Sequence, residues 1–202
     1  MRRMAEIHPD EYLGRRTLIL GEVNTGKTTL TRRILAALLA RGDFEGRVAI
    51  VDMAPEIPEA LAEEKGIAGV GGKLMPPQGH DVLYLGGHLA PPRLSSKTEA
   101  EAIEKARQNR RIVDTLFRKL DGEPREILLL NDVTIYLQAG TAEDLIRRLE
   151  PAATVIANGY WGERLGGGTL TEREKVETAK LKAHFESRGR VLLLGRLASQ
   201  RS

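Results

Sequence analysis

One short segment constrains this chain more than any other feature of its sequence. Gly21–Thr28 matches the pattern G-x-x-x-x-G-K-[ST] at every fixed position. It directly follows Thr17–Leu20, an apolar run that predicts a buried strand, and it directly precedes a helical apolar pattern from Lys27 to about Arg41. A strand, a glycine-containing turn and a helix in this order predict a phosphate-binding loop.

The residue types in this loop suit a nucleoside triphosphate bound with Mg²⁺. Glycines let the backbone wrap around phosphates with N–H groups turned inward, and the helix N-terminus adds partial positive charge. We expect Lys27 to reach the β- and γ-phosphates, the Thr28 hydroxyl to ligate Mg²⁺, and Thr29 to contact the α-phosphate. The predicted nucleotide-binding residues are Gly21, Glu22, Val23, Asn24, Thr25, Gly26, Lys27, Thr28 and Thr29.

Apolar runs alternate with helical patterns along the rest of the chain, which predicts an α/β fold. The predicted strands are Thr17–Leu20, Val48–Val51, Val82–Leu85, Ile127–Leu130, Thr154–Ala157 and Val191–Leu194. The later predicted helices are Lys97–Leu120, Thr141–Leu149 and Thr171–Ser187, with cap-like pairs at Ser96 and Glu99, Thr141 and Asp144, and Thr171 and Glu174. We therefore expect a mostly parallel sheet with helices on both faces, the three-layer fold of P-loop NTPases.

The composition fits a globular chain. At 202 residues it suits a single domain, with 1–14 as an N-terminal extension. Cysteine is absent and no apolar run could cross a bilayer, so we expect a cytoplasmic protein without membrane contact. Net charge is only +3, and we interpret the cluster Arg107, Arg110 and Arg111 as a solvated helix face rather than a nucleic-acid patch.

A phosphate loop needs a carboxylate at the end of a neighbouring strand to complete the magnesium shell. Asp132 follows the strongly apolar run Ile127–Leu130, and we favour it as this metal-holding residue. Asp52 follows Val48–Val51 and is the alternative. If Asp132 holds the metal, Asp52 with Glu56 would face the same crevice and position an acceptor or a water molecule.

Two further polar residues are candidates on position alone. Arg93 follows the third predicted strand and would neutralise transition-state charge as an arginine finger. Asn158 follows the fifth predicted strand and would sense the γ-phosphate or position water; a turn-forming Asn-Gly pair is the alternative interpretation.

These motifs resemble those of the P-loop NTPase superfamily over most of the chain. Leu129–Gly140 and Val155–Gly159 are also similar in layout to P-loop corrinoid adenosyltransferases, although Asn131-Asp132 replaces that family's Asp-Glu pair and Tyr160 replaces an Arg. The same layout resembles recombinase-like ATPase cores. The resemblance implies a shared architecture rather than a shared reaction.

Three functions remain open from the sequence. The first is Mg²⁺-dependent binding and slow hydrolysis of ATP, with Lys27, Asp132 and Asp52 as catalytic candidates. ATP is the default because the guanine-reading N-K-x-D motif is missing, and GTP is not excluded. The second is a transferase or kinase whose small-molecule acceptor binds near Gly66–Gly79 and Gly86–Pro92. The third is a nucleotide-dependent switch with a protein partner or a homo-oligomeric state.

Overall fold

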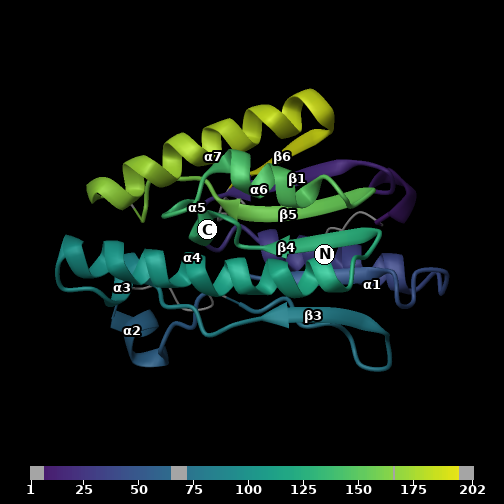
Figure 1. The fold of residues 1–202 in the computed structure, drawn as a ribbon, viewed down its shortest axis with the longest axis horizontal. Helices are drawn as coiled ribbons and strands as arrows, with labels where there is room; N and C mark the ends of the chain where they lie inside the picture. The colour runs from purple at the N-terminus through teal and green to yellow at the C-terminus, as the bar shows by residue number, and fades with distance from the viewer. Residues whose placement is uncertain (1–6, 65–71, 166, 196–202) are drawn as a thin grey trace, which may run out of the picture.

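The apolar runs of the sequence form one sheet in the computed structural model, which describes residues 7–64, 72–165 and 167–195. Within these residues the strand order is β3-β2-β4-β5-β1-β6, and every neighbouring pair is parallel (Figure 1). The strands are β1 (Arg16–Gly21), β2 (Val48–Asp52), β3 (Val82–Gly86), β4 (Ile127–Asn131), β5 (Thr154–Tyr160) and β6 (Arg190–Leu194). All residues of β2, β4 and β5 are buried, as continuous apolar strands in a covered parallel sheet should be.

Helices cover both faces of this sheet, which confirms the predicted three-layer α/β fold. The helical elements are the 3-10 helix η1 (Pro9–Glu11), α1 (Lys27–Leu39), α2 (Glu59–Glu64), α3 (Pro92–Ser95), α4 (Glu99–Gly122), α5 (Thr134–Leu137), α6 (Ala142–Leu149) and α7 (Gly168–Arg188). On one face α1 packs together with Tyr12, so the end of the predicted N-terminal extension lies against the core. On the other face α4 and α7 supply Phe117 and Phe185. No helix in the described ranges is long and apolar enough to span a bilayer.

The starts of the helices test the predicted caps. At α6 the prediction is confirmed, because Thr141 Oγ1 accepts a hydrogen bond from the Asp144 N–H at 3.1 Å. At α4 it was two residues early, since Thr98 rather than Ser96 is the cap. At α7 it was wrong: the helix begins at Gly168, which places Glu174 inside the helix on its buried face.

Strand β5 extends further than the apolar run predicts. It includes Asn158, Gly159 and Tyr160, and the next N–H, from Trp161, donates to the Gly21 carbonyl at 3.0 Å. Asn158 therefore lies in a strand rather than in the turn that follows one. The carboxyl ends of β1, β5, β4 and β2 thus meet at one edge of the sheet, where ligands bind in parallel α/β folds.

The structure describes only the second part of Gly66–Gly79, the segment near which an acceptor was expected to bind. Residues 65–71 lie outside the described part of the chain. Residues from Gly72 onward pass beside the ends of β2 and β4, since the Leu74 N–H and the Gly72 carbonyl both bond to side chains there. This segment therefore contributes backbone groups to the same edge of the sheet.

Candidate functional site

The predicted phosphate loop connects the end of β1 to the first turn of α1. Gly21 has no room for a side chain, because a Cβ there would lie 2.5 Å from the Leu194 carbonyl oxygen and 2.8 Å from Thr25 Oγ1. Gly26 has a φ of 87°, in the left-handed region that favours glycine. The two fixed glycines of the motif thus meet different requirements, close packing at one end and a backbone turn into the helix at the other.

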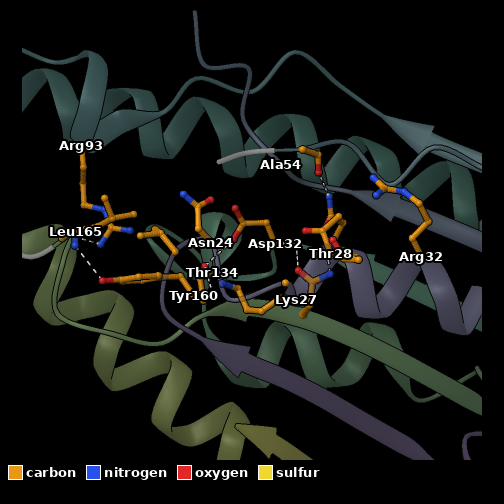
Figure 2. A pocket seen from close by; sticks show the side chains of 16 residues that line it. Asn24, Lys27, Thr28, Arg32, Ala54, Arg93, Asp132, Thr134, Tyr160 and Leu165 are labelled. Carbon is orange, nitrogen blue, oxygen red and sulfur yellow. Dashed lines mark hydrogen bonds between the residues drawn. The ribbon is translucent and has the colours of Figure 1, made fainter. Parts of the chain in front are cut away.

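A cavity of about 360 Å³ lies beside this loop. The loop residues that line it are Val23, Asn24, Gly26, Lys27, Thr28 and Thr29. Asn131, Asp132, Asn158 and Arg93 reach it from other elements. Figure 2 shows Lys27, Thr28 and Asp132 grouped in its middle, with Arg32 at one end and Arg93 at the other. The structure therefore brings together most of the predicted site around one space.

The remaining loop residues shape the cavity without lining it. The Glu22 carbonyl accepts hydrogen bonds from Thr25 Oγ1 at 2.8 Å and from Lys27 Nζ at 2.6 Å. The Glu22 carboxylate accepts from the N–H groups of Glu163 at 2.5 Å and Arg164 at 3.0 Å. Burial acts to raise the pKa of Glu22, but these backbone hydrogen bonds outweigh it and hold the pKa below its usual value. Glu22 therefore ties the phosphate loop to the segment that follows β5.

Lys27 is a partly desolvated cation at the centre of the cavity. Burial lowers its pKa, and the negative charges of Asp132 and Glu22 act in the opposite direction. Within the described residues it donates one hydrogen bond, to the neutral carbonyl of Glu22, although an ammonium group has three donors. Lys27 is therefore suited to bind further oxygen atoms of an anion.

The side chain of Asn131 joins the ends of three strands and a helix. Its Oδ1 accepts from Thr28 Oγ1 at 3.3 Å and from Asn158 Nδ2 at 3.0 Å. Its Nδ2 donates to Asp52 Oδ1 at 2.9 Å and to the Gly72 carbonyl at 3.0 Å. The side chain directly beside the Thr28 hydroxyl is thus the amide of Asn131.

Asp52, a predicted catalytic residue, is completely buried and does not line the cavity. Its Oδ1 accepts from the Ala54 N–H at 3.0 Å and from Asn131 Nδ2, and its Oδ2 accepts from the Leu74 N–H at 2.6 Å and from Tyr84 Oη at 3.1 Å. These four donors take up the acceptor positions of a carboxylate. The contacts favour a structural role for Asp52 over the predicted role in positioning an acceptor or a water molecule.

Asp132 is placed where a functional carboxylate is needed. It lines the cavity, with a φ of 56°, a conformation that non-glycine residues seldom adopt outside functional or turn positions. Its N–H donates to Asn158 Oδ1 at 3.0 Å, and its Oδ1 accepts from Thr134 Oγ1 at 2.8 Å. Burial raises the pKa of Asp132, against the Thr134 hydrogen bond and the positive charges of Lys27 and Arg93.

Two tentative predictions have different outcomes. Asn158 is buried at the cavity wall, where its Nδ2 also donates to Thr31 Oγ1 at 3.0 Å, so it supports the strand ends rather than forming a turn. Glu56 does not line the cavity. Its exposed carboxylate lies 2.8 Å from Nδ1 of His88 instead. The structure thus separates Glu56 from the other candidates.

Arg93 lines the cavity and is held by a carboxylate that the sequence analysis did not identify. Its guanidinium lies 3.0 Å from Glu174 Oε2, donates to the Leu165 carbonyl at 3.0 Å and stacks over the Tyr160 ring. Glu174 also accepts from Gln138 Nε2 at 2.7 Å. Burial raises the pKa of Glu174 to about 7, although Arg93 and Gln138 act to lower it.

The sequence did contain a signal for Glu174. Leu170, Leu181 and Phe185 lie at helical spacing along one buried face of α7, and Glu174 falls on the same face. The other polar residues of that face are Thr171, Glu177 and Thr178. A carboxylate in such a position needs a partner. The spacing of Thr171 and Glu174 is also typical of a helix cap, and Glu174 was interpreted as a capping residue instead.

Comparisons with known proteins add little to this geometry. No protein-family model matches the chain, and no curated protein does. Among solved structures, the chain is similar to a prototypical ATPase from the type III secretion system of pathogenic bacteria, with a TM-score of 0.42 and 16% sequence identity. The match covers 91% of this chain and 52% of that chain, so this chain spans about half of its length. A likeness this distant carries no argument about function.

We expect Asp52→Asn to lower stability. An amide in place of the carboxylate would oppose at least one of the four donors, which costs about 1–3 kcal/mol in the free energy of unfolding. Urea unfolding measures this, with Asp121→Asn on the exposed end of α4 as the matched control. A variant that keeps wild-type stability but loses nucleotide turnover would show instead that Asp52 acts in the chemistry.

Glu174 predicts a specific pH dependence of stability. Because its pKa rises from 4.5 to about 7 on folding, the folded state binds its proton more tightly, and stability is lost as pH rises from about 4.5 through 7. Relative to Glu174→Gln, wild type should lose up to about 3 kcal/mol over this range. Urea unfolding between pH 5 and 8 measures the difference, with the exposed Glu172→Gln as control. Parallel profiles for wild type and Glu174→Gln would contradict the assignment.

Proposed function

We propose that this protein binds a nucleoside triphosphate with Mg²⁺ in the cavity beside Gly21–Thr28 and hydrolyses it slowly. The observation that carries the proposal is the convergence of Lys27, Thr28 and Asp132 on one cavity at the N-terminus of α1. Backbone N–H groups at a helix N-terminus and a nearby ammonium group suit a polyphosphate. Among the described residues, the acidic and basic side chains that line the cavity are those of Lys27, Arg32, Arg93 and Asp132, an excess of positive charge.

The residues beside the loop fit a magnesium ion. Thr28 offers a hydroxyl and Asp132 a carboxylate, and oxygen is the ligand that Mg²⁺ prefers. The described residues contain no cluster of three or more His, Cys, Asp or Glu side chains that could hold a metal alone. This agrees with an ion bound through one carboxylate, a hydroxyl and the phosphate oxygens themselves. When bound, it would neutralise charge that develops on the phosphates.

The small number of carboxylates at the cavity explains why we expect hydrolysis to be slow. Asp132 is the one acidic residue among the described residues that line the cavity. With Asp52 fully engaged in hydrogen bonds, Asp132 would have to serve both the metal's hydration shell and the attacking water. Arg93 lies at the end of the cavity and would stabilise charge on the γ-phosphate if its contact with Glu174 loosens.

A second candidate function is phosphoryl transfer to a small molecule. A smaller cavity of about 140 Å³ adjoins the first, and Arg93 and Tyr160 line both. The smaller cavity is also lined by Thr178, whose buried Oγ1 has no hydrogen-bond partner in the part of the chain that the structure describes. A compound whose hydroxyl takes the γ-phosphoryl group, releasing the nucleoside diphosphate, would fit there. Detection of its phosphorylated product would establish transfer over hydrolysis.

Lys27→Ala should weaken nucleotide binding. Loss of a charge-assisted contact to phosphate predicts an affinity about 10- to 100-fold lower for ATP or GTP with Mg²⁺. Isothermal titration calorimetry measures this, with Lys182→Ala, on the outer surface of α7, as control. If wild type binds neither ATP nor GTP saturably in the presence of Mg²⁺, the proposed function is wrong.

Asp132→Asn should remove turnover more than binding. Without the carboxylate, steady-state hydrolysis should fall by about 100-fold or more, while nucleotide affinity changes by less than about tenfold. Release of inorganic phosphate measures turnover, and Asp121→Asn is again the matched control. Wild-type turnover in Asp132→Asn would exclude Asp132 from the reaction.

A further inference from the structure

A second polar cavity, of about 540 Å³, lies between α4 and the N-terminal part of α7. Figure 1 shows these two helices side by side on the same face of the sheet, and α5 packs against both. This groove, which we call the α4–α7 groove, shares no lining residue with the nucleotide cavity among the described residues. Its charged and polar lining residues include Arg107, Arg110, Arg111, Asp114, Gln138 and Arg173.

Two of these arginines are fixed in place from opposite helices. Arg110 from α4 and Arg173 from α7 both donate to the Ala139 carbonyl, at 3.0 Å and 3.5 Å, and Arg173 also donates to the Gly140 carbonyl at 2.9 Å. Backbone carbonyls carry no net charge, so these bonds orient the guanidinium groups without neutralising them. Arg110 is partly balanced by Asp144 at 3.3 Å.

The other two arginines leave positive charge available to a ligand. Arg111 has no side-chain hydrogen bond or ion pair with any residue in the described ranges. Arg107 has one distant neighbour, Glu104 at 3.9 Å. The groove's own carboxylate, Asp114, is engaged by Arg148 at 2.9 Å. Asp114 also lies 3.7 Å from Arg110, and Asp144 and Glu104 balance Arg110 and Arg107 in part. The lining residues thus hold four guanidinium groups and one carboxylate, with Arg111 an arginine that has no carboxylate beside it among the described residues.

A buried amide adds a second, independent feature. Gln138 lines the groove and is 1% exposed. Its Nε2 donates to Glu174, but its Oε1 has no partner among the residues that the structure describes. Buried polar atoms without a partner are uncommon in folded proteins, and each one calls for an explanation. A ligand hydroxyl or N–H group would satisfy this oxygen.

We propose that the α4–α7 groove binds a phosphorylated small molecule that also carries a hydroxyl group, such as a sugar phosphate. Guanidinium groups bind phosphate oxygens in a bidentate manner, and the cavity volume is in the usual range for small-molecule sites. Aromatic residues are absent from its described lining, so the groove lacks the stacking surfaces of a single-stranded nucleic-acid site. From the sequence, Arg107, Arg110 and Arg111 were interpreted as a solvated helix face. Arg173 and Gln138 are distant from them in sequence, so the sequence did not predict that these side chains line one groove.

Ribose 5-phosphate and inorganic phosphate are suitable probes for this site. Isothermal titration calorimetry on wild type and on Lys27→Ala should give saturable ribose 5-phosphate binding of similar affinity in both, since the nucleotide cavity is not involved. The double substitution Arg107→Ala with Arg111→Ala should weaken binding by about tenfold or more. Arg118→Ala, also exposed on α4, is the control and should change affinity by less than about twofold.

Gln138→Leu tests the amide separately from the charges. The substitution should weaken the binding of ribose 5-phosphate more than the binding of inorganic phosphate, because only the sugar offers hydroxyl groups to Gln138 Oε1. The proposal is overturned if wild type binds neither probe saturably, or if binding is unaffected by loss of both arginines. Binding that disappears in Lys27→Ala would assign the probes to the phosphate loop instead. Arginine-dependent binding of single-stranded RNA without binding of ribose 5-phosphate would replace the small-molecule class with a nucleic acid.

Discussion

The four hydrogen bonds of the Asn131 side chain are the constraint on which the site depends. They connect the end of β4 to Asp52 at the end of β2, to Asn158 in β5 and to Thr28 at the start of α1. Buried polar groups that satisfy one another in this way hold a single geometry, because any displacement leaves a donor or an acceptor without a partner. The contact of Thr28 with Asn131 thereby fixes the predicted phosphate loop to the sheet. The Glu22 carboxylate fixes the loop to the segment after β5. Lys27 is left facing the cavity.

The fold was predictable because its signals are local. Each strand is a short apolar run, each long helix shows a helical period of apolar residues, and Gly21–Thr28 carries its motif in consecutive residues. The short helices α2, α3 and α5 have too few residues to show a period and were not predicted. The preference for Asp132 over Asp52 as the metal-holding residue had only the more apolar strand before Asp132 to support it. Both follow apolar strands, and what distinguishes them is the set of donors around Asp52, which come from residues distant in sequence such as Leu74 and Tyr84.

Charge is divided between two regions on the same molecule. In the cavity beside Gly21–Thr28, Lys27, Arg32 and Arg93 outnumber Asp132 among the described residues, and Arg93 forms an ion pair with Glu174. In the α4–α7 groove, four arginines face Asp114. Gln138 lines the groove and donates to Glu174, and Glu174 forms an ion pair with Arg93, which lines the other cavity. A chain of three contacting side chains therefore connects the two regions. Both regions suit anionic ligands, although the net charge of the whole chain is only +3.

The most direct test of the central claim is a crystal structure grown with Mg²⁺ and a non-hydrolysable nucleoside triphosphate. The account predicts the β- and γ-phosphates within hydrogen-bond distance of Lys27 Nζ, with the metal on the Thr28 hydroxyl and Asp132 facing its hydration shell. It also predicts Asp52 unchanged in its four hydrogen bonds. A nucleotide bound elsewhere, or a metal held by Asp52 with Asp132 turned away, would contradict it.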